Sequence, residues 1–322
     1  MRKRWCSVLL ISALILSLAV LPSCTMPQSS ISRSGFYFDT YISVTVFGDE
    51  ETLDGVFELC AKYDRLLDRY DENSDIYKIN NSHGTEVEVA PEVLEIINLA
   101  IYYSQMSEGV FDLTCGSATV LWDFNSENAK IPDEQARNNA VKLIDYTSVK
   151  VSENKVFVPD GVQLDLGGIA KGFVADKIVE FLVENGVEDA LIDLGGNILA
   201  LGDKNGSPWR IGIKYPDSSD YVGAVESSAR MSVVTSGDYE RYFEIDSVRY
   251  HHILDTDTAM PAVTDVRSVT ILSQSSAQGD ALSTICFILG YEAASELVSG
   301  IDGVEAVFVL DDGRVIQTAD IL

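Results

Sequence analysis

The segment DLGGIAKGFVAD at residues 165–176 decides how this chain is expected to fold. Apolar residues over 162–166 predict a short buried strand, which runs into Gly167 and Gly168 before a helical pattern begins. Glycines at such a turn let a ligand approach the backbone, and the first N–H groups of the next helix point toward it. Lys171 adds a positive charge suited to a phosphate group. The spacing matches neither the P-loop nor the Rossmann template, so a plain strand–helix turn remains the alternative.

The elements around this segment mix strands and helices without strict alternation. This order predicts an α+β fold, with mixed sheets and packed helices, rather than a doubly wound sheet. Helices are expected over about 50–70, 91–107, 169–184, 276–289 and 292–298, and strands over 36–47, 149–151, 155–158, 190–193, 198–201, 209–214, 221–225, 267–272, 304–310 and 314–317, with 230–253 mostly strand.

Four further polar segments follow in order along the chain: DLGGN at 193–197, TSGDYER at 235–241, HHILDTDT at 251–258 and DALST at 280–284. Taken singly, the first three are explained by a hairpin or bulge, a turn, and a histidine packed at a strand end. A histidine in the third could also accept a proton near neutral pH.

The last segment is the clearest candidate for a metal site. On a helix, Asp280 and Thr284 share one face, so both side chains can direct oxygen atoms at one ion. A carboxylate with a hydroxyl suits Mg²⁺, which keeps other positions for waters and phosphate oxygens. An aspartate capping an amphipathic helix is the alternative explanation.

The composition limits the range of partners. The chain has 322 residues, and 23 Lys and Arg stand against 50 Asp and Glu, which gives a net charge of −27. So acidic a surface repels phosphate backbones, and we expect no nucleic-acid partner. A phosphate-containing ligand would need backbone amides or a metal ion.

The N-terminus has the pattern of an export signal. Three basic residues at 2–4 precede an apolar stretch over about 8–20, and Leu-Pro-Ser-Cys then ends at Cys24. This resembles a bacterial lipoprotein signal. We therefore predict a signal peptide over 1–23, a lipidated Cys24 with a flexible tether over 24–35, and a folded domain over 36–322, anchored at the extracytoplasmic face of a membrane. An ordinary signal peptide and an uncleaved anchor helix are the alternatives.

Taken together, the five segments resemble the FAD:protein FMN transferase family, also called ApbE-like flavin transferases. Earlier segments agree, namely FDTYISV at 38–44, YDENSDI at 70–76 and GVFDLT at 109–114. The resemblance covers roughly 36–290 and implies an ApbE-like, T-fold-related architecture. It implies an enzyme that needs Mg²⁺, splits FAD, and places FMN on a Ser or Thr of an exported partner carrying a Ser/Thr-Gly-Ala-Thr type motif, with release of AMP.

The resemblance also implies roles for individual residues. The metal ligands would be the Asp280 and Thr284 side chains and the Ala170 carbonyl. The catalytic groups would be His252, Lys171 and Asp176. The FAD-binding residues would be Tyr70, Asp112, Gly167, Gly168, Lys171, Asn197, Ser236, Gly237, Arg241 and His252.

Two positions depart from the family pattern. The family usually continues H-I-x-D-P-x-T-G, whereas here Thr256 and Ala259 replace the proline and the glycine. The geometry of the loop beside His252 is therefore the least determined part of the site. Two other classes remain open: an FAD-binding lipoprotein or FAD pyrophosphatase without protein transfer, and a lipid-anchored solute receptor. The metal pair together with the histidine favours the transferase.

Overall fold

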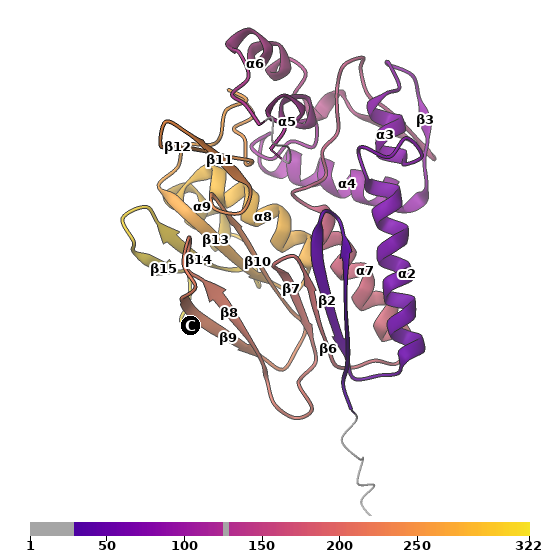
Figure 1. Ribbon diagram of the computed structural model, residues 1–322, viewed down its shortest axis with the longest axis vertical. Coiled ribbons are helices and arrows are strands. Elements are labelled where there is room, and N and C mark those ends of the chain that lie inside the picture. The colour runs from indigo at the N-terminus through magenta and orange to yellow at the C-terminus, as the bar shows by residue number, and fades with distance from the viewer. Residues whose placement is uncertain (1–28, 125–128) are drawn as a thin grey trace, which may run out of the picture.

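An eight-stranded antiparallel sheet forms the centre of the molecule, in the order β1-β2-β6-β7-β10-β13-β14-β15 (Figure 1). The computed structural model describes residues 29–124 and 129–322. The strands of this sheet are β1 (Ile31–Tyr37), β2 (Thr40–Val46), β6 (Ala190–Leu194), β7 (Asn197–Leu201), β10 (Met231–Gly237), β13 (Val266–Ser273), β14 (Glu305–Leu310) and β15 (Val315–Gln317).

Helices and small sheets surround this central sheet. The helices are α2 (Glu50–Leu67), α3 (Asp75–Asn80), α4 (Pro91–Met106), α5 (Gly116–Trp122), α6 (Glu134–Val141), α7 (Ala170–Glu184), α8 (Ser276–Leu289) and α9 (Tyr291–Ser299), with a 3-10 turn at Tyr146–Ser148. The small sheets are β3 (Val87–Glu88) with β5 (Lys155–Phe157) and β4 (Lys150–Ser152), β8 (Trp209–Lys214) with β9 (Tyr221–Ser227), and β11 (Tyr242–Ile245) with β12 (Val248–His251).

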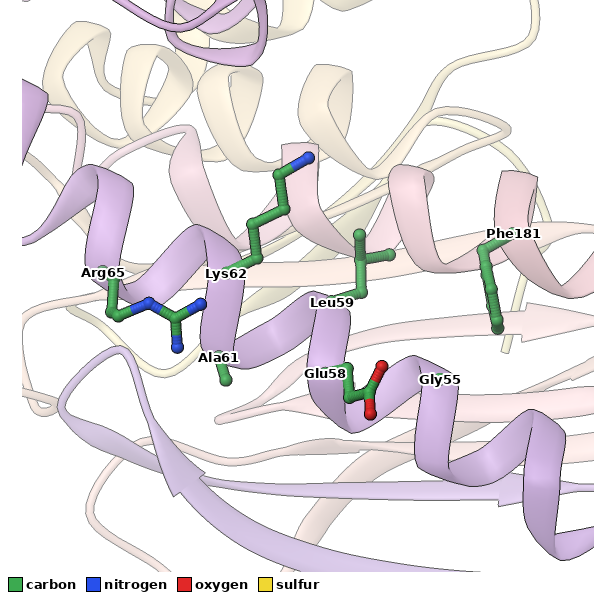
Figure 2. A pocket seen from close by; sticks show the side chains of 7 residues that line it. All are labelled: Gly55, Glu58, Leu59, Ala61, Lys62, Arg65 and Phe181. Atoms are coloured by element: carbon green, nitrogen blue, oxygen red, sulfur yellow. The ribbon is translucent and has the colours of Figure 1, made fainter.

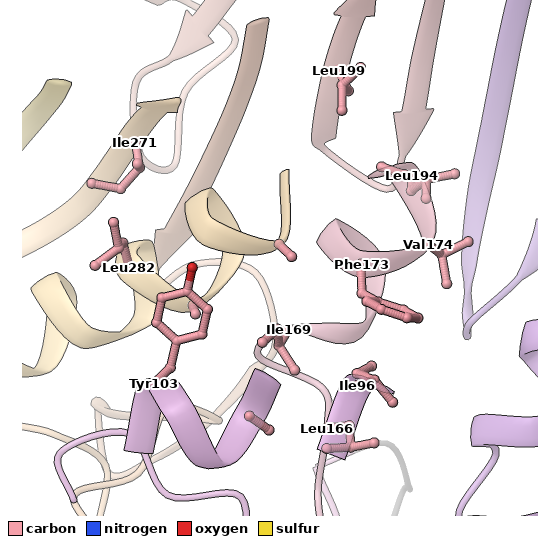
Figure 3. Close-up of a cluster of buried hydrophobic side chains, with 14 of the residues drawn as sticks. Ile96, Tyr103, Leu166, Ile169, Phe173, Val174, Leu194, Leu199, Ile271 and Leu282 are labelled. Atoms are coloured by element: carbon pink, nitrogen blue, oxygen red, sulfur yellow. The ribbon is translucent and has the colours of Figure 1, made fainter. Parts of the chain in front are cut away.

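The central sheet buries both of its faces because successive side chains of a strand point to opposite sides. On β13, Ile271 belongs to the core beneath the helices, while its neighbour Leu272 packs with Trp209 of β8. The larger core joins side chains of α4, α7 and α8 to the strands (Figure 3), among them Ile96, Tyr103, Ile169, Phe173, Leu194, Leu199 and Leu282. This packing fixes α7 and α8 relative to the sheet, and these two helices carry most of the candidate site.

The predicted α+β class is confirmed, and several elements lie where the apolar spacing placed them. The helices at Pro91–Met106 and Ser276–Leu289 are examples. Among the residues described, no helix is both long and apolar enough for a membrane crossing.

The N-terminal part of the domain differs from the prediction. Residues 36–47 are not one strand, because Phe38 (φ 54°) and Asp39 (φ 56°) form a left-handed two-residue turn between β1 and β2. β1 already begins at Ile31, inside the segment predicted to be a flexible tether. It is held there by pairing with β2 and by Arg33, which forms ion pairs with two carboxylates of α2. The predicted signal peptide and Cys24 lie outside the described residues.

Candidate active site

The start of α7 meets the start of α8 at a contact that only glycine allows. A Cβ atom on Gly172 would lie 2.2 Å from the Ser276 carbonyl oxygen, well inside van der Waals contact. Because the backbones approach so closely, the Gly172 N–H donates a hydrogen bond of 2.9 Å to Oδ2 of Asp280. The Asp280 carboxylate is thereby held against the first turn of α7.

Thr284 extends this contact by one helical turn. Its Oγ1 is 3.4 Å from the position that a Cβ on Gly168 would occupy, so the glycine turn passes directly beside the hydroxyl. Ser236, from the end of β10, lies 3.4 Å from the same Oγ1 and 2.8 Å from the Ser283 hydroxyl. The structure therefore brings Asp280, Thr284, Ser236 and the glycine turn together.

The oxygen atoms of this group suit a hard divalent cation. The second oxygen of Asp280 accepts no hydrogen bond from the described part of the chain, and Thr284 Oγ1 makes only long contacts of 3.4 Å. Ala170, whose carbonyl is the third predicted ligand, begins α7 between Gly168 and Gly172. A carboxylate, a hydroxyl and a carbonyl fit Mg²⁺. Over residues 29–124 and 129–322, no cluster of three or more His, Cys, Asp or Glu side chains offers another metal site.

His252 lies just beyond β12 and is bonded to the backbone of Arg241. Its N–H donates to the Arg241 carbonyl at 3.0 Å, and its ring Nδ1 lies 3.2 Å from the same oxygen. A carbonyl oxygen only accepts, so Nδ1 carries the proton and Nε2 keeps a free lone pair. Although part of the ring remains accessible to solvent, burial lowers its pKa to about 3, with further lowering from the positive charges of Arg241 and Lys171. The imidazole is therefore neutral at physiological pH, with an unprotonated Nε2.

Lys171 and Arg241 bring positive charge to this site. Neither side chain forms an ion pair with a carboxylate of the described residues, and Lys171 Nζ contacts only the Gly167 carbonyl, at 3.4 Å. Their common effect on the pKa of His252 places both near the ring, and an anionic ligand would complement them.

Tyr70 stands at the edge of the same region, two residues beyond the C-cap of α2. Its ring is 68% exposed, and the Arg69 guanidinium lies 5.7 Å from the ring centre. Arg69 in turn forms an ion pair with Asp165, whose Oδ1 accepts the Gly167 N–H at 2.9 Å. An exposed aromatic face beside the glycine turn offers a stacking surface for a planar ring.

Asp176 and Asn197 lie at the start of α8, where both side chains are bonded to the protein. The Asp176 carboxylate accepts hydrogen bonds from the N–H groups of Ser276 and Ala277, from Ser275 Oγ and from Arg230, so it holds the start of α8. Asn197 is 1% exposed and accepts from Ser276 Oγ at 2.6 Å, which places it in the same cap. Both residues position α8 from beneath the site.

Asp112, expected among the FAD ligands, is hydrogen-bonded within the protein. Its carboxylate accepts hydrogen bonds from the N–H and hydroxyl of Thr114 and from the Tyr146 N–H. Burial raises the pKa of this carboxyl group.

Gly237, another predicted site residue, leaves room for the ring of Tyr239, which would lie 2.5 Å from a Cβ atom at position 237.

The loop after His252 is well bonded despite its departures from the family pattern. Thr256 Oγ1 donates to the Gly109 carbonyl at 2.9 Å, and Asp255 caps the next turn through the N–H of Thr258. Ala259 adopts a left-handed conformation (φ 53°), and its carbonyl accepts from Trp122 Nε1 at 3.0 Å. The chain thus keeps at Ala259 the backbone geometry for which glycine is the usual residue.

A separate groove of about 500 Å³ lies along α2, beside Phe181 of α7 (Figure 2). Its lining residues are Gly55, Glu58, Leu59, Ala61, Lys62, Arg65 and Phe181. It contains none of the predicted site residues, so it is distinct from the site at the start of α7.

The glycine turn, the two cations, the neutral histidine and the exposed ring are the features of an enzyme that acts on a phosphate-containing substrate. A profile of the ApbE family matches residues 38–308, and the chain belongs to this family. It is 38% identical to the FAD:protein FMN transferase of Treponema pallidum, covering 84% of this chain and 80% of that protein. It is 35% identical to that of Klebsiella pneumoniae, covering 84% and 86%. The crystal structure of the ApbE protein from Thermotoga maritima superposes with a TM-score of 0.84 at 32% identity, covering 90% of this chain and 97% of that chain.

Proposed function

We propose that this protein is a FAD:protein FMN transferase, which moves FMN from FAD to a Ser or Thr hydroxyl of an exported partner protein and releases AMP. The relatives that carry this name support the proposal over most of the chain. The observation that carries it is the hydrogen bond between Gly172 and Asp280, because it joins a carboxylate to the glycine turn beside Lys171 and His252.

The substrate would be bound by residues of three segments. The N–H groups of the glycine turn, with Lys171 and Arg241, would hold the diphosphate, since backbone amides and cations stabilise phosphate oxygens. The exposed ring of Tyr70 would stack on the flavin. Ser236 would lie between the bound substrate and α8, beside Thr284.

His252 would act as the general base. With Nδ1–H held by the Arg241 carbonyl, Nε2 would take the proton of the incoming hydroxyl. The hydroxyl oxygen would form a bond to the phosphorus of the FMN half, while the bond from that phosphorus to the bridging oxygen breaks and AMP leaves with the electron pair. General base catalysis of this kind contributes about 10²–10⁴-fold in rate.

Asp280, Thr284 and the Ala170 carbonyl would hold Mg²⁺. When bound there, the ion would neutralise charge on the diphosphate and make it a better electrophile. The hydrogen bond from Gly172 would keep the Asp280 carboxylate oriented for this purpose.

The test is incubation of the purified protein with FAD, Mg²⁺ and a peptide containing a Ser/Thr-Gly-Ala-Thr motif. We expect the peptide to gain the mass of an FMN group and AMP to appear in equal amount, with a His252→Ala variant as the control for chemistry. Free FMN with AMP and an unmodified peptide would indicate a pyrophosphatase. Tight binding of intact FAD alone would indicate a binding lipoprotein, and no affinity for FAD would indicate a solute receptor.

We also propose that the protein is lipid-anchored through Cys24 at the extracytoplasmic face of a bacterial membrane. The basic, apolar and cysteine-containing order of residues 1–24 supports this placement. Metabolic labelling with a fatty acid should label the native chain and not a Cys24→Ala variant, which should be released from membranes. Equal labelling of both chains would contradict it.

A further inference from the structure

An ion pair beneath the exposed ring of Tyr70 links that ring to the glycine turn. Arg69 Nη1 lies 2.7 Å from Asp165 Oδ2, and the Thr119 hydroxyl bonds to both side chains at 2.9 Å. Arg69 Nη2 also reaches the Gly116 carbonyl, at 3.5 Å. The two charged side chains are 15% and 22% exposed, so the pair is largely removed from solvent.

Each member of the pair contacts a different part of the proposed substrate site. Arg69 lies below the Tyr70 ring, with 5.7 Å between the guanidinium carbon and the ring centre. Asp165 accepts the Gly167 N–H at 2.9 Å and so shapes the turn that would hold the diphosphate. One bonded unit therefore lies against both the stacking surface and the phosphate turn.

We propose that Arg69 and Asp165 are a positioning pair that fixes the spacing between the Tyr70 ring and the Gly167–Lys171 turn, and so selects a dinucleotide with a flavin ring over one without it. The inference rests on the proposed function and names residues that set its substrate specificity. In FAD the ring and the diphosphate are joined by a ribityl chain of fixed covalent length. Two protein surfaces held at the matching separation can bind the flavin ring and the diphosphate at the same time, without first having to be ordered by the ligand.

The arginine side chain is suited to this position. Its planar group can bond Asp165, Thr119 and Gly116 at once while presenting a face to the Tyr70 ring. A largely buried ion pair contributes little net stability because its desolvation is costly. Its value here lies in geometry, since the only hydrogen bond that Tyr70 makes to the described residues is from its own N–H to Asp68.

The experiment measures the dissociation constants of FAD and of ADP-ribose, which carries adenine and diphosphate but no flavin ring. For Arg69→Met we expect FAD binding to weaken about tenfold and ADP-ribose binding to change less than about twofold. Arg69→Lys, which keeps the charge, should lose less than Arg69→Met. Tyr70→Ala combined with Arg69→Met should bind FAD no more weakly than Tyr70→Ala alone, because both changes remove the same contact.

Lys177→Met is the matched control. Lys177 is 18% exposed, lies 2.7 Å from Glu95 and sits 5.3 Å over the Phe173 ring, away from the glycine turn. This variant should bind both ligands as the native chain does. Equal weakening of both ligands by Arg69→Met, full additivity with Tyr70→Ala, or the same loss in Lys177→Met would overturn the proposal, because each is expected of a merely structural ion pair.

Two further outcomes keep the test decisive. Should Arg69→Met fail to fold, Thr119→Val removes the bridging hydroxyl at constant shape, and about a threefold loss confined to FAD is expected. A native chain that binds no FAD would refute the proposed function itself. A native chain that binds and transfers, with Arg69→Met and Thr119→Val unchanged, would refute only the positioning pair.

Discussion

The Gly172 N–H and the Asp280 carboxylate are joined by a hydrogen bond of 2.9 Å across 108 residues of sequence. This bond couples the first turn of α7 to the second turn of α8. Because a larger residue at 172 would collide with the Ser276 carbonyl, the coupling depends on the glycine as well as on the carboxylate. Its functional consequence is an oriented carboxylate beside the proposed phosphate turn.

The variant Asp280→Asn removes the negative charge of this side chain but keeps its size and shape. The asparagine oxygen can still accept from Gly172, so the fold should be retained, while the loss of charge removes the strongest proposed ligand of Mg²⁺. We expect FMN transfer at fixed Mg²⁺ to fall at least about 100-fold. Initial rates over a titration of Mg²⁺ measure this. Ser283→Ala, on the same helix, is the control, and an unchanged Mg²⁺ dependence in Asp280→Asn would contradict the assignment.

Lys171→Met tests whether this cation recognises phosphate. FAD should bind about tenfold more weakly, whereas riboflavin, which has no phosphate, should bind within about twofold of the native value. Flavin fluorescence measures both constants. Lys204, an exposed lysine over the Trp209 ring in the loop after β7, provides the control variant Lys204→Met. A parallel loss for riboflavin would instead indicate a general disturbance of the pocket.

Local patterns were sufficient to predict the pairing of Asp280 with Thr284. Residues four apart on a helix share a face whatever the tertiary structure, and the helix itself was evident from its apolar spacing. The same reasoning located the glycine turn before α7, but the strand predicted over 162–166 is wrong, because this segment forms only a single β-bridge, from Gln163 to Cys115. These features are determined within a few residues of sequence.

Long-range contacts could not be predicted in this way. Arg69 and Asp165 are 96 residues apart, and nothing local shows which of the chain's many charges will meet. Asp176 occupies a motif position typical of function, yet its carboxylate caps a helix that begins 100 residues later. The β1–β2 turn is hard to predict for a different reason, since Phe38 adopts a left-handed conformation in which a bulky residue is uncommon.

An ion-pair network ties the hairpin β11–β12 to the sheet, and we expect it to support His252 and Arg241. Arg249 of β12 lies 2.9 Å from Asp217 and 3.4 Å from Asp238, and Arg267 of β13 bonds to the same two carboxylates. Arg249→Met should destabilise the hairpin by about 1–3 kcal/mol, as expected for lost charged hydrogen bonds. Amide hydrogen exchange over Tyr242–His251 should accelerate, with a lower rate of transfer.

The control for the network is Arg314→Met. Arg314 is an exposed partner of Asp312 at the turn before β15, and its loss should leave hairpin exchange unchanged. If exchange in the hairpin is the same in Arg249→Met as in the native chain, the network does not hold the hairpin.

The lowered pKa of His252 predicts the pH dependence of activity. A ring with a pKa of about 3 is already neutral at pH 5, so kcat/KM for FAD should show no acidic limb from this residue between pH 5 and 7. His252→Ala should still bind FAD while transfer falls about 10²–10⁴-fold. A limb near pH 6.5 that disappears in His252→Ala would show that the ring is not held neutral.

The same pKa shift has a predictable sign for stability. The folded chain has a pKa of about 3 for His252, against 6.5 for an unperturbed histidine, so between these values the unfolded chain binds more protons. The contribution of the neutral His252 ring to the free energy of unfolding is fully present above about pH 6.5 and is lost as the pH falls toward 3. The free energy of unfolding should therefore drop more between pH 7.5 and pH 5 in the native chain than in His252→Gln.

The left-handed backbone at Ala259, in the loop beside His252, determines which residues this position accepts. A left-handed alanine costs about 1–2 kcal/mol relative to glycine, but its methyl group is fully buried and contributes about 0.8 kcal/mol. Because these terms oppose each other, the free energy of unfolding of Ala259→Gly should lie within about 1 kcal/mol of the native value. The variant should also retain FMN transfer. Ala259→Val adds a β-branched side chain in the same conformation, and a loss of about 3 kcal/mol or more is expected. Ala262→Val, at a buried alanine of the same loop without a left-handed backbone, isolates the cost of overpacking and should be milder. Equal losses for valine at 259 and 262, measured by denaturant unfolding, would show that backbone conformation does not determine which residues position 259 accepts.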